Sequence, residues 1–142
     1  MRYLALVIPG DPTAYQSGEM PSAELMNEMG KFNEELAKAG VLLGLDGLHP
    51  TSRAKRIKFS GSKPVVTDGP FAEAREVIGG YWIWQVKSEA EALEWAKKAP
   101  MERNATIELR RIYEPEDFGA EVAANEHKLM SEVEKNKQRT NA

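Results

Sequence analysis

Two segments of the chain are apolar on both faces of an extended strand, and this limits the possible folds more than any other feature. In residues 2–8 one apolar set alternates with another, Tyr3, Ala5 and Val7 against Leu4, Leu6 and Ile8. In residues 79–87 the two sets are Trp82, Trp84 and Val86 against Tyr81 and Ile83. Successive side chains of a strand point to opposite sides, so both faces of these strands avoid water. We predict that they form the centre of a sheet that is covered on both sides.

Two amphipathic helices are expected between the strands. The first begins after Ser22, a residue type preferred at helix N-caps, and ends at Gly40. Its apolar stripe has helical spacing and consists of Leu25, Met29, Phe32 and Leu36. The second begins after Ser88, which forms a capping box with Glu91, and stops before Pro100. Each helix therefore has one face suited to packing on a sheet.

The remaining segments complete the order of elements. Residues 9–21 are predicted to be a loop, residues 41–48 a second strand and residues 105–113 the last core strand. Residues 53–59 and 64–67 are predicted to pair as a charged hairpin. The resulting order, β-α-β, hairpin, β-α-β, predicts an α+β domain of the ferredoxin-like βαβ-βαβ plan with an inserted hairpin.

This plan leaves one face of the sheet without cover from its own chain. Both helices lie on the same side, yet the first strand and the strand at residues 79–87 are apolar on the other side too. Apolar surface costs about 25 cal/mol per Å² when it stays in water. A second copy of the chain would cover that face, so we predict a homodimer.

The end of the chain differs in character from the domain predicted for residues 1–118. Residues 114–119 form a linker, and residues 120–137 can form a helix. The apolar stripe of this helix is sparse and consists of Val122, Leu129, Met130 and Val133. For the tail, residues 119–142, we favour a helix that docks on the partner subunit over a frayed, solvated segment.

The composition argues against several functions. The chain has no cysteine, which excludes disulfides, thiolate zinc sites and a cysteine nucleophile. Two histidines without any cysteine give little support for a metal site. We therefore expect no metal and no cofactor. The net charge of −3 argues against nucleic-acid binding. No apolar run approaches the ~20 residues that cross a bilayer, and residues 1–8 do not form a signal peptide, so we expect a cytoplasmic protein without a membrane partner.

A longer motif identifies a family. Residues 65–76 read Val-Val-Thr-Asp-Gly-Pro-Phe-Ala-Glu-Ala-Arg-Glu, and Gly79-Gly80-Tyr81-Trp82 follows. With residues 40–48 and 92–96, this pattern resembles the DGPF proteins of the YCII-related family over about residues 1–118. The resemblance implies a ferredoxin-like subunit, a dimeric α+β barrel and a cavity near the dimer interface. YCII-like proteins are suspected of catalysis through a His–Asp pair, and Asp68 matches the aspartate of the motif.

His49 and Asp68 are the candidate catalytic residues. A histidine can move a proton at neutral pH, and a carboxylate can orient it. Asp46 is an alternative partner three residues before His49. The simpler interpretations are a surface histidine before a proline and an aspartate that accepts backbone amides in the Asp-Gly-Pro turn.

The candidate substrate-binding residues are three aromatic and two basic side chains, Tyr81, Trp82, Trp84, Arg75 and Arg110. The rings would pack on a small molecule and an arginine would bind an anionic group. One hypothesis is therefore a lyase or isomerase that acts by proton transfer in a dimer-interface cavity. The alternatives are a non-catalytic dimer that binds a small molecule or regulates a partner, and a purely structural dimer whose sheets pack without a cavity.

Two further groups of residues have simpler expected roles. The basic run at residues 53–63 is expected to protect an exposed hairpin from strand-to-strand aggregation, with a rim that attracts an anionic ligand as the alternative. Met20, Met26 and Met29 are expected to be core residues rather than a ligand platform.

Overall fold

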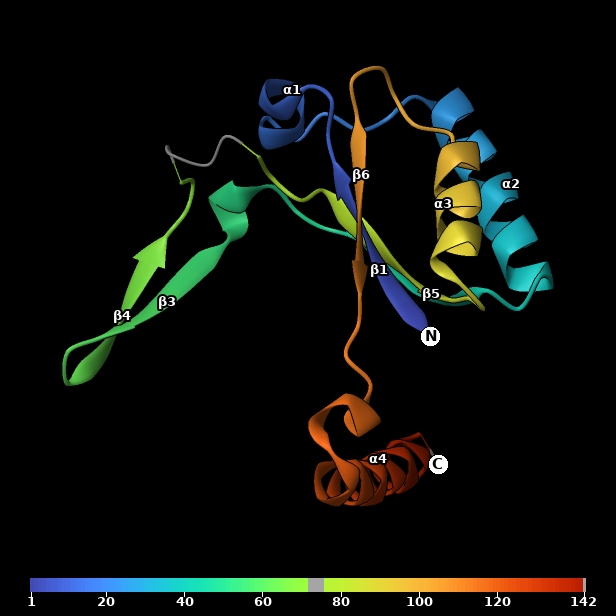
Figure 1. Cartoon of the computed structure of the whole chain (residues 1–142). Coiled ribbons are helices and arrows are strands. Elements are labelled where there is room, and N and C mark those ends of the chain that lie inside the picture. Colours follow the sequence, from blue (N-terminus) through green and yellow to red (C-terminus); the bar gives the residue numbers. More distant parts are fainter. Residues whose placement is uncertain (72–75, 142) are drawn as a thin grey trace.

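The computed structural model describes residues 1–71 and 76–141. Along the chain the elements are β1 (Arg2–Ile8), α1 (Pro12–Gln16), α2 (Ala23–Lys38), β2 (Leu42–Gly47), η1 (Thr51–Arg53), β3 (Lys55–Ser60), β4 (Lys63–Asp68), β5 (Gly80–Gln85), α3 (Glu89–Lys98), β6 (Thr106–Arg111), η2 (Pro115–Phe118) and α4 (Ala120–Thr140), where η denotes a 3-10 turn. Figure 1 shows a body that contains a sheet with α1, α2 and α3, and two arms that project from it, the β3–β4 hairpin and α4.

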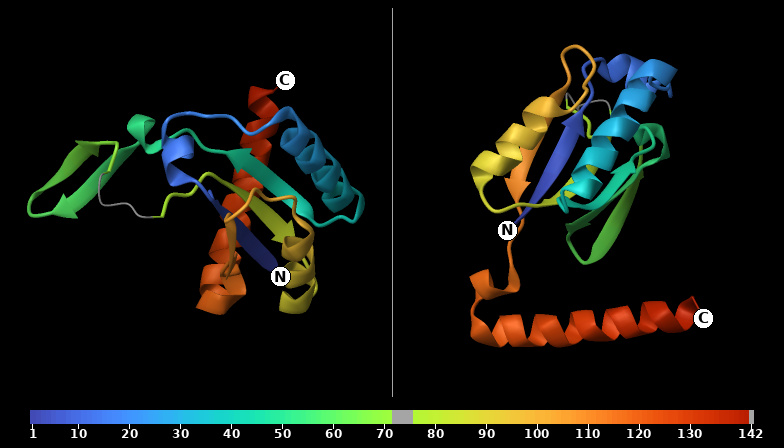
Figure 2. Two further views of the ribbon diagram at one scale, coloured as in Figure 1. Left: turned by 90° about the horizontal axis from the view of Figure 1, so that it is seen from above. Right: turned by 90° about the vertical axis from the view of Figure 1, so that its right-hand side faces the viewer.

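The body is an antiparallel four-stranded sheet in the order β2-β5-β1-β6, and β3 and β4 form a separate two-stranded sheet. Helices α2 and α3 lie side by side over one face of the four-stranded sheet, as Figures 1 and 2 show. The predicted α+β class and the predicted order β-α-β, hairpin, β-α-β are confirmed.

Local signals account for both helix starts. The side chain of Ser22 accepts a hydrogen bond from the Leu25 amide, and the side chain of Ser88 accepts one from the Glu91 amide. Gly40, just after α2, has φ +72°, a conformation that glycine adopts without a Cβ penalty. The predicted limits of both helices are therefore correct to within a residue or two.

The prediction of a loop throughout residues 9–21 is wrong, because α1 lies within it. Asp11 caps this short helix by accepting a hydrogen bond from the Ala14 amide at 3.0 Å, and Pro12 occupies its first turn. Proline is favoured there because its φ suits the helix and its missing amide has no partner to lose. A single helical turn has too little periodicity to be found from apolar spacing.

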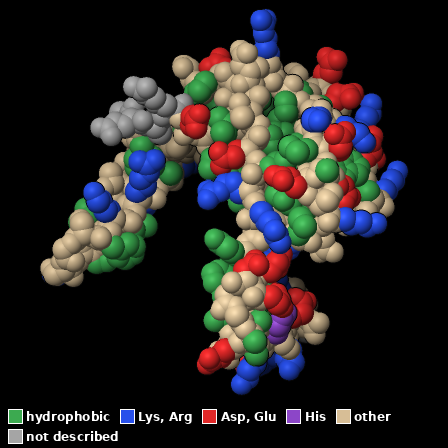
Figure 3. All heavy atoms as spheres, in the orientation of Figure 1, with side chains coloured by type: hydrophobic (Ala, Val, Ile, Leu, Met, Phe, Trp, Pro, Cys, Tyr) green, Lys and Arg blue, Asp and Glu red, His purple; other side chains and the backbone are tan. Residues whose placement is uncertain are grey.

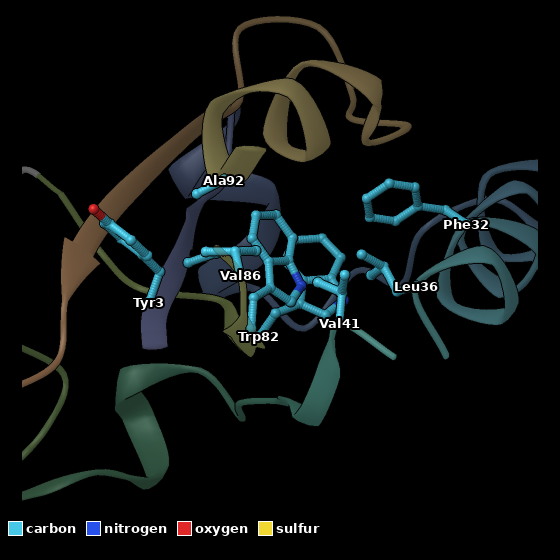
Figure 4. Packing of buried hydrophobic residues seen from close by; sticks show 9 residues of the cluster. Tyr3, Phe32, Leu36, Val41, Trp82, Val86 and Ala92 are labelled. Atoms are coloured by element: carbon cyan, nitrogen blue, oxygen red, sulfur yellow. The ribbon is translucent and has the colours of Figure 1, made fainter. Parts of the chain in front are cut away.

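The core lies between the sheet and the two helices. Trp82 and Trp84 project from β5 toward the helices and meet the ring of Phe32 edge-on, with ring centroids 5.7 and 6.5 Å away. Figure 4 shows the cluster, in which Leu36 and Val41 lie beside the tryptophan rings. The predicted alternation in the first and fifth strands is confirmed, since one set of side chains in each strand is buried in this core.

The opposite face of the sheet has no helix over it (Figure 1). The second apolar set lies there at half-buried positions, and the register pairs Leu4 with Ile83 and Leu6 with Tyr81. Arg110 pairs with Leu4 on the same face, whereas Arg111 pairs with Tyr3 on the helix side. These two arginines therefore point to opposite faces of the sheet. We call this uncovered surface the open face.

The predicted C-terminal helix is present and extends to Thr140. It packs against η2, and Ala123 is its only buried residue. The helices described for residues 1–71 and 76–141 include none with both the length and the apolar character needed to span a bilayer.

Candidate functional site

Two adjoining hollows lie where α1 and the loop after it approach the end of β2. The larger has a volume of about 590 Å³ and the smaller about 390 Å³. They share five lining residues, Tyr15, Glu19, Met20, Gly47 and Leu48. The two hollows therefore adjoin along these residues, and we call the pair the Tyr15 site.

Tyr15 holds the two sides of this site together. Its hydroxyl donates to a group of backbone carbonyls, with oxygen–oxygen distances of 2.8 Å to Leu48, 3.0 Å to His49 and 3.4 Å to Ile78. Partial burial raises the pKa of this phenol, because the charged form loses hydration. Gly79 packs closely against this ring, and a Cβ on Gly79 would lie 3.0 Å from Pro9 Cγ and 3.3 Å from Tyr15 Cε2, so both side chains would have to shift slightly.

The larger hollow is the polar part of the site. His49, Ser52 and Arg53 line it from the β2–η1 side, and Gln16 lines it from α1. The Gln16 side chain donates to Thr51 Oγ1 at 2.7 Å and accepts from the Thr51 amide at 3.0 Å. These two bonds fix η1 against α1, so the lining residues on both sides keep their spacing.

The smaller hollow is the apolar part, and four methionines line it, Met20, Met26, Met29 and Met101. Met20 is 77% exposed and Met26 is 52% exposed, so the prediction that both are core residues is wrong. The physical reason is their position, since Met20 lies in the loop before α2, and Met26 lies in α2 outside the stripe of Met29, Phe32 and Leu36 that packs on the core. Met29 packs against the core as predicted.

The structure places His49 and Asp68 on either side of η1 without joining them. His49 is two residues before η1, and Gly69, next to Asp68, donates its amide to Ala54 O just after η1 at 2.9 Å. The Asp68 carboxylate binds Lys55 Nζ at 2.5 Å, and no described hydrogen bond or ion pair connects it with His49. His49 thus belongs to the Tyr15 site and Asp68 to the hairpin.

Asp46, the alternative partner of His49, has a different contact. Its Oδ2 accepts a hydrogen bond from the Tyr81 hydroxyl at 2.7 Å on the open face. This bond raises the pKa of Tyr81, since the neutral phenol is the form that donates.

The five predicted substrate-binding residues do not share one place. Trp82 and Trp84 lie in the core and are 4% and 0% exposed, respectively. Tyr81 and Arg110 lie on the open face. Arg75 lies outside the described residues. None of the four described residues lines the Tyr15 site.

Residues 1–71 and 76–141 contain no group of three His, Cys, Asp or Glu side chains placed to hold a metal ion.

The sequence did not indicate Tyr15 and Gln16 as site residues, because both lie in the segment that was predicted to be a loop. The signal that could have found them is the Asp11-Pro12 helix start, which fixes the direction of the next turn.

Comparison with known proteins supports the family resemblance. Over 73 residues the chain is 32% identical to an uncharacterised protein of Rhizobium meliloti (strain 1021), a region that covers 51% of this chain and 59% of that protein. The chain thus spans little more than half the length of that relative. The model of the YCII-related domain matches residues 1–116. The chain belongs to the YCII-related domain family.

Proposed function

We propose that this protein is a homodimer that binds a small molecule in the Tyr15 site of each subunit. The observation that carries the proposal is that a more polar hollow and an apolar one adjoin at Tyr15 and Met20. Small-molecule sites combine an apolar surface, which supplies affinity, with a few polar groups that fix orientation. The Tyr15 site has both parts, and the hydrogen bonds of Tyr15 and Gln16 keep them in place.

The lining favours a ligand with an apolar body and an anionic group. Methionine side chains are unbranched and polarisable, so the four in the smaller hollow can adapt to a flat or irregular apolar body. Arg53 in the larger hollow offers a guanidinium, which binds carboxylates and phosphates through two parallel hydrogen bonds. His49 adds a second polar contact beside it.

The open face supports the homodimer. Leu4, Leu6 and Ile83 lie there half-buried with no helix over them, and a second copy of the sheet would remove them from water. Two such ferredoxin-like subunits packed sheet to sheet would form a dimeric α+β barrel. The same packing would bring Tyr81 and Arg110 to the interface.

A second candidate function is proton transfer by His49, in a lyase or isomerase reaction on the bound molecule. The observation that favours it is that His49 lines the larger hollow, beside the position proposed for the anionic group. A histidine is the side chain most often used to move protons at neutral pH. Asp68 could orient it only after exchanging its present partner, Lys55.

A thermal-shift screen tests the binding function. The library should contain aryl and alkyl carboxylates and phosphates together with their neutral amides, and calorimetry should measure the affinity of each hit. We expect the acids to raise the melting temperature and the amides to fail. Arg53→Gln should weaken binding about tenfold to a hundredfold, since a charge-assisted hydrogen bond contributes about 1.5–3 kcal/mol.

Lys38→Gln, at the far end of α2, is the matched control and should bind as the wild type does. Equal affinity of Arg53→Gln and Lys38→Gln for every hit would refute the assignment of the site. Each hit should also be incubated with the protein and followed by NMR. If the wild type converts a hit to a product and His49→Gln does not, the proton-transfer function is supported. If the hit remains chemically unchanged, the protein binds it without catalysis.

A further inference from the structure

The β3–β4 hairpin is an arm with an apolar side. The register places Ile57 opposite Val66 and Phe59 opposite Pro64, so these four side chains share one side of the two-stranded sheet. Phe59 is 82% exposed, and Ile57 and Val66 are each more than half exposed. A two-stranded hairpin is marginally stable at best in water without a surface to cover its apolar side. Figures 1 and 3 show this arm projecting from the body.

Helix α4 is a second arm whose apolar side is also uncovered. It runs for 21 residues, and its exposed apolar stripe consists of Val122, Leu129 and Met130. Most of the stability of a protein helix comes from packing an apolar face rather than from propensity. Contacts with η2 at the start of α4 leave this stripe uncovered in the subunit.

The hairpin and the part of α4 that bears the apolar stripe carry opposite charge. Residues 55–68 contain four Lys or Arg and one Asp, a net charge of +3. In α4, residues 120–134 contain one Lys and four Glu, a net charge of −3, whereas residues 135–140 contain two Lys and one Arg. Lys58 and Lys63 lie on the other side of the hairpin from the apolar residues, and long lysine side chains can reach round an edge to a carboxylate. The hairpin therefore complements residues 120–134 of α4 in apolar surface and in charge.

From these features we infer a clasp, in which the hairpin of one subunit packs its apolar side on the α4 stripe of the other subunit. Within one subunit the arms stand apart, as Figure 3 shows, so each arm requires a second copy to be covered. Two-fold symmetry repeats the contact, and the dimer then has two clasps in addition to the sheet interface. The inference rests on the proposed homodimer, which the open face supports independently.

Single cysteines test the clasp, because the chain has none of its own. One full-length chain carries Phe59→Cys, and a second, size-tagged chain carries Val122→Cys, Leu129→Cys or Met130→Cys. The two chains are mixed, allowed to exchange subunits and treated with a mild oxidant. A disulfide requires Cα atoms within about 7 Å, so it reports direct packing. All four positions are exposed, so the substitutions remove no core contact.

The matched control replaces Phe59→Cys with Lys58→Cys, one residue away on the other side of the hairpin. We expect a mixed disulfide with at least one α4 position, in several-fold excess over this control. If light scattering shows a dimer but no pair exceeds the control, the clasp is wrong and the homodimer stands. The clasp is also wrong if Leu129→Cys chains link mainly to each other. A monomer in light scattering would overturn both the clasp and the homodimer.

Discussion

The two core tryptophans of β5 offer a matched test of how this core is stabilised. Trp82 Nε1 donates to Asn33 Oδ1 at 2.8 Å, whereas Trp84 Nε1 is buried without a partner among the described residues. Both side chains are nearly inaccessible and both contact Phe32. Trp82→Phe and Trp84→Phe therefore remove the same atoms from similar surroundings, and differ in whether a hydrogen bond is lost.

The magnitudes follow from three contributions. Truncation of a core aromatic residue to alanine costs about 3–5 kcal/mol, and the smaller change to phenylalanine should cost about 1–2 kcal/mol at either site. Trp82→Phe also loses a hydrogen bond, which adds about 1 kcal/mol. Trp84→Phe removes a buried donor whose desolvation costs about 1–3 kcal/mol, and this gain offsets the packing loss. We expect Trp82→Phe to be the less stable variant by about 2–4 kcal/mol.

Urea unfolding followed by far-ultraviolet circular dichroism measures the difference. Every variant should be studied at one protein concentration, because a dimer has a concentration-dependent stability. Asn33→Ala provides the control, since it should destabilise the wild type but have little further effect on Trp82→Phe. If Trp84→Phe loses as much stability as Trp82→Phe, or more, then the unpaired indole N–H of Trp84 does not destabilise the folded protein by the desolvation free energy given above.

Two further predictions concern glycines and tyrosine ionisation. A Cβ on Gly69 would lie 1.7 Å from Thr51 O, so Gly69→Ala should lower the melting temperature sharply, with a loss on the order of 2–4 kcal/mol. Gly30→Ala, in the interior of α2 with no atom within 4 Å of the new Cβ, should instead stabilise by roughly 1 kcal/mol, and equal melting temperatures for the two variants would contradict both expectations. The bond to Asp46 raises the pKa of Tyr81, so its stabilisation is present below the ordinary tyrosine pKa of about 10 and is lost as the pH rises through the raised value. An ultraviolet titration of tyrosinate in Asp46→Ala should show one tyrosine ionising at lower pH than in the wild type, and an unchanged titration would rule out the bond.

The arrangement of the hairpin explains why the predicted His49–Asp68 pair could not be checked from the sequence. Asp68 lies opposite Lys55 because of the register of β3 and β4, and the two side chains form an ion pair. Hairpin register depends on the turn and on cross-strand packing, so the identity of a cross-strand partner is not visible in a linear pattern. His49 lies just before η1 and lines the larger hollow together with residues of α1. The sequence predicts a loop for that segment, so this neighbour of His49 is not visible in the sequence either.

The sequence by itself determined the elements whose signals are local. The two-sided alternation in residues 2–8 and 79–87 defined the central strands, and Ser22 and Ser88 defined two helix starts, because side-chain periodicity and capping act over a few residues. Only the tertiary structure decided what those elements enclose. The Tyr15 site exists because a one-turn helix and an exposed loop meet the end of β2, and its bonds join residues 33 to 63 positions apart. Contacts at such separation depend on how the whole chain packs, and no local preference of the residues encodes them.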